Sequence, residues 1–366
     1  MMYRNEKLHN LEYLHAVYLL LGPACNMSCR HCTQTPIKST LNLPPCGGKL
    51  SDDVVKFLRQ WNKVRNFGRI YFWGGEPLLY WETIKNLILK FNSLGFLRQY
   101  VIFTNGLLLD DNIADFCNEH NVWVTMSHDA PNCTAVRNAI PSQKNINAFL
   151  RIRRRNVNAV FNAINSDMVA TLEFLKKKFP GTPLTLGFIN VLSDIPKDIW
   201  EFKKGQVEKA VKDLAKYSVD IFDPFGEREA WFRTKLSRLQ GWNKARFLEY
   251  PFPPCRPGLV SLSINFKGDV IRCHNDDKIL GHIREGVNAL QDKHLEEWRR
   301  LLPPNCKDCK HLSICRNICP IALLKEDKSE LIYCDYLRDF WAAIEDCQGE
   351  YEIMKANLRE YRQIRR

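Results

Sequence analysis

The chain has 366 residues, a mass of 42.8 kDa and a formal net charge of +12, with 45% hydrophobic and 26% charged residues. This is the composition of a globular protein that is long enough to form two domains. No apolar run approaches the length of a membrane span, and the N-terminus lacks the apolar segment of a signal peptide, which excludes an integral membrane protein and a secreted one. We therefore expect a cytoplasmic protein whose 14 cysteines include metal ligands and form no disulfide framework.

Short apolar strands alternate with amphipathic helices from about residue 15 to residue 240. The expected strands cover residues 16–21, 69–73, 99–104, 122–126, 159–165 and 184–191. The expected helices begin with one that Ser51 caps, followed by 81–91, 111–119, 144–154, 168–179 and 197–216. Repeated strand–helix units predict a parallel sheet with right-handed crossovers, in which the chemistry lies at the C-terminal ends of the strands.

Three cysteines follow the first expected strand: Cys25, Cys29 and Cys32, in the spacing C-x3-C-x2-C. Three thiolates on one loop can hold three irons of a [4Fe–4S] cube and leave the fourth iron without a protein ligand. The open iron is a place for another molecule to bind, so the motif indicates chemistry more than electron storage. A zinc site is the alternative for this motif taken alone.

Polar segments follow the next three expected strands. The second strand ends at Gly74-Gly75-Glu76-Pro77, in which glycines let the backbone approach a ligand closely and the carboxylate can pair with an ammonium group. The third strand is followed by Asn105, and the fourth ends at Ser127-His128-Asp129. These segments therefore fall where a parallel barrel places its reactive groups.

In this order the motifs resemble those of the radical S-adenosylmethionine (radical SAM) enzymes. The resemblance implies a partial (β/α)6 barrel in which SAM binds the open iron and is cleaved, by one electron, to methionine and a 5′-deoxyadenosyl radical. It also implies that the ring of His31 packs on the adenine of SAM and that the Gly-Gly-Glu-Pro segment contacts the methionine amino group. Ser127, Asp129 and Arg137 resemble the Ser-x-Asp…Arg segment that lies near the ribose and the carboxylate of SAM in relatives. The implied cofactor contacts are His31, Gly74, Gly75, Glu76, Pro77, Asn105, Ser127, Asp129 and Arg137.

A second set of seven cysteines lies after about residue 250: Cys255, Cys273, Cys306, Cys309, Cys315, Cys319 and Cys334. Their spacing resembles the SPASM domain, an auxiliary-cluster module of peptide-modifying radical SAM enzymes, with zinc as the alternative. By the family's arrangement a first auxiliary iron–sulfur cluster is held by Cys255, Cys273 and Cys319, and a second by Cys306, Cys309, Cys315 and Cys334. The first cluster then has an open iron, for water, a substrate thiolate or a spare cysteine, or it is a smaller cluster.

The expected domains are an extension at 1–14, the barrel at 15–240, a SPASM domain at 250–345 and a C-terminal helix at 346–366 that packs on the barrel. Four cysteines, Cys347 among them, lie outside both motifs. We expect Cys117 to be a small buried hydrophobe within a helix. Cys46 and Cys133 fall on loops at the catalytic face, where each is either a donor of a hydrogen atom to a substrate radical or an inert thiol.

The resemblance implies a maturase that abstracts hydrogen from a ribosomally made peptide and forms a thioether, a carbon–carbon cross-link or another oxidised side chain. A peptide epimerase is the alternative, and it needs a hydrogen donor such as Cys46 or Cys133. An alternative of another class is a non-catalytic iron–sulfur electron-transfer protein. Sulfatase-type maturation is less expected, because those relatives carry an aspartate after the second SPASM cysteine, whereas His274 follows Cys273 here.

The implied partners are the precursor peptide and an electron donor such as a flavodoxin or a ferredoxin. Basic runs lie at 151–155, 176–178 and 359–366. These runs are either solvated helix faces or a docking surface for an acidic leader. Nucleic acid is supported by the net charge alone, because no nucleic-acid module is recognisable.

Overall fold

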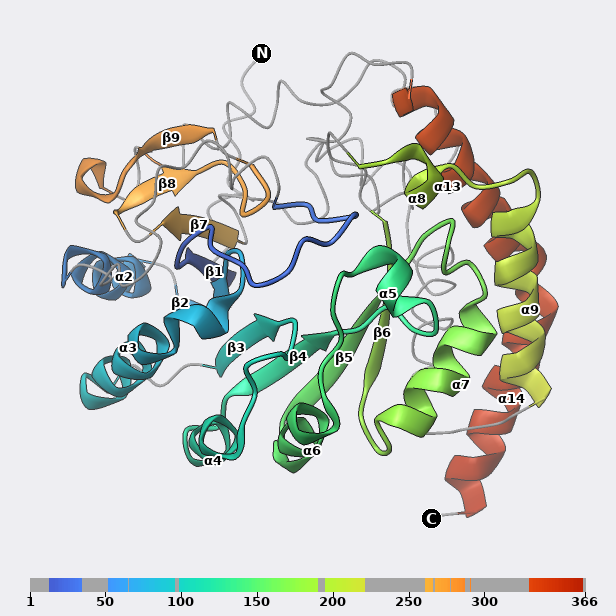
Figure 1. Cartoon of the computed structure of the whole chain (residues 1–366), viewed down its shortest axis with the longest axis horizontal. Coiled ribbons are helices and arrows are strands. Elements are labelled where there is room, and N and C mark those ends of the chain that lie inside the picture. The colour runs from blue at the N-terminus through green and yellow to red at the C-terminus, as the bar shows by residue number, and fades with distance from the viewer. Residues whose placement is uncertain are drawn as a thin grey trace.

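Six parallel strands lie side by side in chain order and form the inner layer of the protein (Figure 1). The computed structural model describes residues 13–34, 52–64, 66–95, 99–189, 195–220, 261–265, 267–276, 278–286, 290 and 329–364. The six strands are β1 (Tyr13–Leu20), β2 (Asn66–Trp73), β3 (Gln99–Thr104), β4 (Trp123–Ser127), β5 (Arg155–Phe161) and β6 (Leu184–Phe188). The sheet curves, and the longer described helices that alternate with its strands lie on its outer face. The expected α/β fold is confirmed.

The helices follow the strands in alternation. They are α2 (Asp52–Val64), the 3-10 helix η1 (Pro77–Tyr80), α3 (Trp81–Ser93), α4 (Asp111–Glu119), α5 (Cys133–Val136), α6 (Gln143–Arg151), α7 (Met168–Lys178), α8 (Lys197–Trp200) and α9 (Gln206–Asp220). Side-chain caps fix where several of them begin: Asp110 accepts a hydrogen bond from the Ile113 amide (2.8 Å) and Asp167 from the Ala170 amide (2.8 Å). Such caps satisfy backbone donors that a helix N-terminus otherwise leaves unpaired.

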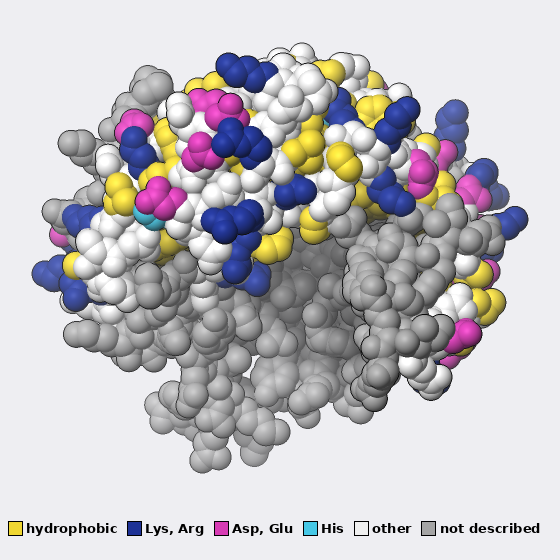
Figure 2. Space-filling view, turned by 90° about the horizontal axis from the view of Figure 1, so that it is seen from below, with side chains coloured by type: hydrophobic (Ala, Val, Ile, Leu, Met, Phe, Trp, Pro, Cys, Tyr) yellow, Lys and Arg dark blue, Asp and Glu magenta, His cyan; other side chains and the backbone are white. Residues whose placement is uncertain are grey.

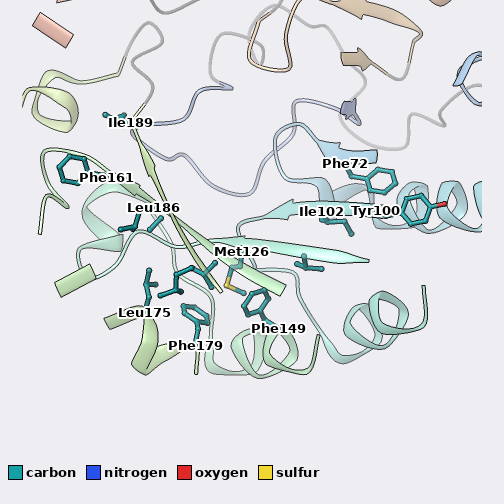
Figure 3. Close-up of a cluster of buried hydrophobic side chains, with 14 of the residues drawn as sticks. Phe72, Tyr100, Ile102, Met126, Phe149, Phe161, Leu175, Phe179, Leu186 and Ile189 are labelled. Carbon is teal, nitrogen blue, oxygen red and sulfur yellow. The ribbon is translucent and has the colours of Figure 1, made fainter. Parts of the chain in front are cut away.

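The apolar core lies between the sheet and these helices (Figure 3). Phe72, Ile102 and Met126 point from three strands into this layer and are fully buried. Phe149 and Phe179 meet them from the helical side, with ring centroids 5.8 Å apart. Because side chains alternate along a strand, residues next to these face the inside of the barrel; Tyr71, Trp73, Phe103 and Ser127 are half-buried there.

Three later strands extend the same sheet beyond β1, so that its order is β6-β5-β4-β3-β2-β1-β7-β8-β9. β7 (Ser261–Asn265) pairs with β1 in parallel, and the antiparallel strands β8 (Asp269–Ile271) and β9 (Ile279–His282) follow it, with the 3-10 helix η2 (Ile283–Glu285) after them. The sequence did not reveal these strands, because each is short. The expected domain boundary near residue 250 lies outside the described residues.

Two C-terminal helices, α13 (Ser329–Asp346) and α14 (Gln348–Ile364), pack against α9. Tyr351 and Met354, in the segment where a C-terminal helix is expected, are buried. The sequence analysis did not predict α13, although Trp341 and Ile344 on it are fully buried. No helix among the described residues is long and apolar enough to cross a membrane.

The expected strand at 159–165 was wrong, because β5 covers Arg155–Phe161. Its first half carries polar side chains that face the inside of the barrel, which hides the apolar pattern of a strand. Its end is set by Asn162, whose side-chain oxygen accepts hydrogen bonds from the amides of Ile164 (3.0 Å) and Asn165 (2.9 Å) and turns the chain.

Two expected helices also differ from the structure. The helix at 197–216 is broken into α8 and α9: Glu201 is extended (φ −81°, ψ 96°) and ends α8, and Gly205, with a φ of 75°, directly precedes α9. The helix at 144–154 ends at Arg151, since Ile152 is extended (φ −70°, ψ 123°) and fully buried. In both cases the tertiary position of one residue overrides local helix propensity.

We expect the contact between α13 and the barrel to stabilise the fold. Ile344→Ala should lower the free energy of unfolding by about 2–5 kcal/mol, because a buried side chain is removed and a cavity is left. The matched control is Ile353→Ala, at a side chain that is 49% exposed, for which a loss below about 1 kcal/mol is expected. Urea unfolding of the two variants measures both values. Equal losses would show that α13 does not contribute to the core.

Candidate functional site

A cavity of about 310 Å³ opens at the C-terminal ends of the parallel strands. Trp73 and Glu76 line it from the end of β2 and the segment that follows, Phe103 from β3, Ser127 from β4 and Asn158 from β5. The cavity therefore lies at the edge of the sheet where barrels of this type place their chemistry.

The three cysteines of the first motif line this cavity together: Cys25, Cys29 and Cys32. Burial raises the pKa of the Cys29 thiol to about 11, and the other two cysteines add to this effect while Arg137 opposes it. The Met27 amide donates to Cys25 Sγ (3.4 Å), and Arg137 Nη1 lies 3.6 Å from Cys29 Sγ. Hydrogen bonds to cysteine sulfur are typical of iron–sulfur sites, where they tune the reduction potential.

The donor set fits a [4Fe–4S] cube, in which each cysteine binds a different iron. In the described ranges no three His, Cys, Asp or Glu side chains lie close enough to hold a single metal ion. The cysteine loop is held against α5 and the residues after it: the Arg30 amide donates to the Val136 carbonyl (2.9 Å), and the Ser28 amide donates to Asn138 Oδ1 (2.8 Å).

The Gly-Gly-Glu-Pro segment is joined to the start of the cysteine loop by backbone hydrogen bonds. The Gly75 amide donates to the Gly22 carbonyl (2.9 Å), and the Glu76 amide donates to the Ala24 carbonyl (2.8 Å). A Cβ atom added at Gly75 would lie 2.1 Å from the Ala24 oxygen, and one added at Gly74 would lie 2.5 Å from the Gly22 oxygen. The two glycines are therefore required for the contact between the loops, a reason that the sequence analysis did not give.

Glu76 is almost fully buried, and its carboxylate joins the ends of β2 and β3. It accepts hydrogen bonds from the Leu78 amide (3.0 Å), the Thr104 hydroxyl (2.7 Å) and the Asn105 amide (2.8 Å). Burial raises the pKa of the carboxyl, and these hydrogen bonds act in the opposite direction. A cationic group brought into the cavity would offset the cost of burying the carboxylate, which fits the ammonium partner expected from the sequence.

Asp129 and Arg137 form a buried ion pair beside His31. Arg137 Nε donates to Asp129 Oδ2 (2.6 Å), the Val160 amide donates to Asp129 Oδ1 (2.8 Å), and His31 Nε2 lies 3.2 Å from Asp129 Oδ2. Burial alone would raise the pKa of Asp129, but the Arg137 guanidinium and the hydrogen bond from the Val160 amide act in the opposite direction, and the pKa is lowered. Burial lowers the pKa of His31 to about 4, so its ring is neutral at neutral pH. His31 Nδ1 is buried without a hydrogen-bond partner among the described residues, which leaves it for a ligand.

The structure brings together most of the cofactor contacts that the sequence predicted. Those that line the cavity are His31, Gly74, Gly75, Glu76, Pro77, Asn105, Ser127 and Arg137. Asp129 does not line it: the fully buried carboxylate lies behind Arg137 and His31 and orients them. From this position Asp129 orients two side chains that line the cavity, and we therefore describe it as a positioning residue.

Sequence reasoning missed several residues of the cavity wall. Trp73 and Phe103 line it. The alternation of side chains along a strand could have identified both, since each follows a core-facing residue near the C-terminal end of its strand. His274 and Asn275 also line it, from the loop after β8. No local pattern indicates these two, because their place in the cavity depends on the pairing of β7 with β1.

The second set of cysteines is described only in part. Cys273 is buried directly before His274, and Cys334 lies half-buried in α13. The other predicted ligands, Cys255, Cys306, Cys309, Cys315 and Cys319, and the candidate Cys46, lie outside the described residues. The two auxiliary clusters therefore stay predictions.

The remaining cysteines are buried. Cys117 belongs to the apolar core, as expected. Cys133 begins α5, is 4% exposed and is not among the described residues that line the cavity. Burial raises the pKa of its thiol, as it does for Cys347, whose pKa is raised to about 11.

Comparison with known proteins gives relatives with the same architecture. The chain is 24% identical over 363 residues to the "Radical SAM cyclopropyl synthase TigE" of Paramaledivibacter caminithermalis, covering 91% of this chain and 73% of the relative. It is similar in structure to "Native anSMEcpe with bound AdoMet and Cp18Cys peptide", with a TM-score of 0.66, 21% identity and coverage of 92% and 99% of the two chains. It is also similar to SuiB of Streptococcus suis bound to S-adenosylmethionine, with a TM-score of 0.61, 16% identity and coverage of 88% and 77%.

The fold and the cavity define a parallel α/β barrel with three cysteines of one loop gathered at its strand ends. The family model of the Radical SAM superfamily matches residues 19–202. The chain belongs to the radical SAM superfamily. The family implies catalysis with a [4Fe–4S] cluster and SAM, and the cysteines, glycines and carboxylate described above are the groups of this chain that fit them.

The buried pair of Asp129 with Arg137 predicts a large effect of Asp129→Asn. The variant should lose about 3–5 kcal/mol of unfolding free energy at pH 7, because Arg137 would stay buried without its counter-charge. The folded-state pKa of Asp129 is lowered, so its contribution is present above the unfolded pKa of about 3.9 and is lost as the pH falls below it. Urea unfolding from pH 8 to pH 3.5 should show a difference that shrinks only at the acid end.

The matched control for this substitution is Asp198→Asn. Asp198 pairs with Arg30 at 2.7 Å, but its side chain is 58% exposed, so the expected loss is below about 1 kcal/mol. A loss for Asp129→Asn no larger than that of the control would contradict the positioning role.

Proposed function

We propose that this protein is a radical SAM maturase that modifies a ribosomally made peptide and carries auxiliary iron–sulfur clusters in its C-terminal part. One observation supports this proposal most strongly: the loop after Cys273 lines the same cavity as the three-cysteine loop. Gln34, two residues after Cys32, donates from Nε2 to the His274 carbonyl (2.8 Å) and to Asn275 Oδ1 (2.6 Å). A cluster at Cys273 would thus lie beside the substrate site.

When bound, the [4Fe–4S] cluster supplies the electron that splits SAM into methionine and a radical able to remove a substrate hydrogen. The residues of this chain bind and orient the reactants. Glu76 presents a carboxylate for the ammonium group of SAM, and Arg137, held by Asp129, presents a guanidinium to its carboxylate. His31 offers its ring for the adenine and a ring nitrogen that has no hydrogen-bond partner among the described residues. An oxidised product leaves behind an electron, which an auxiliary cluster at Cys273 would accept.

We infer that the product is a cross-link or another oxidised side chain. The relative that is aligned over 91% of this chain is named a cyclopropyl synthase, and closing such a ring forms a carbon–carbon bond. A structural relative is bound to a Cp18Cys peptide, which supports a peptide substrate. Auxiliary ligands would be Cys255, Cys273 and Cys319 for one cluster, and Cys306, Cys309, Cys315 and Cys334 for the other.

The basic runs do not form one free cationic patch in the described part of the chain. Figure 2 shows the face that carries α4 and α6, where Lys and Arg side chains are interspersed with acidic ones. Arg151 pairs there with Asp111 (2.6 Å) and Asp115 (2.7 Å). This arrangement favours solvated helix faces over a docking surface for an acidic leader at this place.

The test is anaerobic turnover of the reconstituted protein with SAM, a reductant and the small peptide encoded beside its gene, in light and in heavy water. Loss of two hydrogens from the peptide supports the proposal. An unchanged mass in light water with deuterium gained in heavy water would mean epimerisation and would overturn it. SAM cleavage with an untouched peptide would mean another substrate. Cys29→Ala should abolish SAM cleavage, whereas the core substitution Cys117→Ala should retain it.

The auxiliary cluster at Cys273 makes a separate prediction. Cys273→Ala should lower the iron content by up to about four irons per chain, because one cube loses a ligand. SAM cleavage should remain, since the three-cysteine loop is unchanged. Cys347→Ala is the matched control, at another buried cysteine, and should keep the full iron content. Iron analysis and electron paramagnetic resonance measure both, and equal iron in the two variants would exclude Cys273 as a ligand.

A further inference from the structure

Stacked and edge-to-face rings form one wall of the cavity. His274 stacks on Tyr18 of β1, with ring centroids 4.1 Å apart and planes at 17°. It meets Trp73 edge-to-face (4.8 Å, 71°), and Trp73 meets Phe103 in the same way (4.6 Å, 63°). Trp73, Phe103 and His274 line the cavity, and Tyr18 supports them from β1. Such ring pairs hold each other in fixed orientations, so the wall is preorganised.

Hydrogen bonds from the cysteine loop hold His274 in this wall. Gln34 Nε2 donates to the His274 carbonyl and to Asn275 Oδ1, and the Thr33 hydroxyl donates to the same Asn275 oxygen (3.3 Å). The loop that follows Cys32 is therefore joined to the loop that follows Cys273. The position of His274 is therefore fixed by the stacking of its ring on Tyr18 and by the hydrogen bond from Gln34 to its carbonyl.

The described lining of the cavity offers no spare charge to a substrate side chain. Its two carboxylate or guanidinium groups are Glu76 and Arg137. In the proposed function SAM engages both, Glu76 through its ammonium group and Arg137 through its carboxylate, and Arg137 is also paired with Asp129. The other described lining groups are apolar, thiol, imidazole or uncharged polar side chains. A charged substrate side chain would enter this space without a counter-charge, which is costly, whereas an apolar one would gain by burial against the rings.

We propose that Trp73, Phe103 and His274 are the wall that receives the substrate side chain, and that they select an uncharged, apolar or aromatic residue of the peptide. In this assignment His274 acts through the face of its ring and determines specificity. The inference rests on the proposed function, since it names the residue type that the peptide presents to the radical.

The test uses the reconstituted holoenzyme with SAM and a reductant. The probes are pools of blocked heptapeptides, each with one deuterated central residue: leucine, phenylalanine, aspartate or lysine. When a C–D bond of the peptide is broken, the deuterium appears in 5′-deoxyadenosine, where mass spectrometry detects it. For the wild-type protein we expect transfer from leucine or phenylalanine to exceed transfer from aspartate and lysine by about tenfold or more, which corresponds to about 1.4 kcal/mol or more.

Two substitutions test the role of the ring. His274→Phe keeps a ring in the wall and should keep the preference for apolar residues. His274→Asp places a carboxylate there and should raise the ratio of lysine to leucine transfer about tenfold or more, a change of preference that mere loss of structure does not produce. His120→Asp, in a ring contact with Phe116 outside the cavity, is the matched control and should keep the wild-type ratio.

The outcomes separate this inference from the proposed function. Transfer from aspartate or lysine pools at the level of leucine would overturn the inference and leave the maturase function standing. The same holds if His274→Phe loses deuterium transfer while SAM is still cleaved, because the ring nitrogens would then be required. SAM cleavage with no transfer from any pool would overturn the proposed action on peptides, and the assignment of the wall with it.

Discussion

The backbone contact between the end of β2 and the start of the cysteine loop determines the geometry of the site. The amides of Gly75 and Glu76 bind the carbonyls of Gly22 and Ala24, so the loop that carries the three cysteines is attached to the segment that carries the buried carboxylate. Both glycines are needed for this approach, because a Cβ atom would collide with a backbone oxygen that cannot move aside. Backbone hydrogen bonds therefore fix the distance between the three-cysteine loop and Glu76.

A second layer of contacts makes the site rigid. Asp129 is removed from the cavity, yet it holds Arg137, approaches His31 and accepts a hydrogen bond from β5 through Val160. A buried carboxylate with three such neighbours has little freedom to move. Arg137 and His31, which line the cavity, are thus oriented from behind by a residue that does not line it, as is common where binding geometry must be precise.

The sequence was sufficient for the parts of the fold and of the site that depend on local pattern. The strand over Gln99–Thr104 and the helix over Asp111–Glu119 were predicted with their observed bounds, because each has a clear apolar period and turn residues at its ends. β5 was misplaced because its polar residues face the inside of the barrel. His274 and Asn275 could not be found in this way, since they reach the cavity through the pairing of β7 with β1, which is a contact between residues distant in the sequence.

The pairing of β7 with β1 covers an edge of the six-stranded barrel sheet. β1 is the strand that leads into the cysteine loop, and β7 covers the side of it that β2 does not. A chain shortened before residue 261 would leave β1 as an unprotected edge, with free amides and carbonyls able to pair with another molecule. By pairing with β1, the C-terminal strand β7 therefore protects the edge of the first barrel strand from pairing with another molecule.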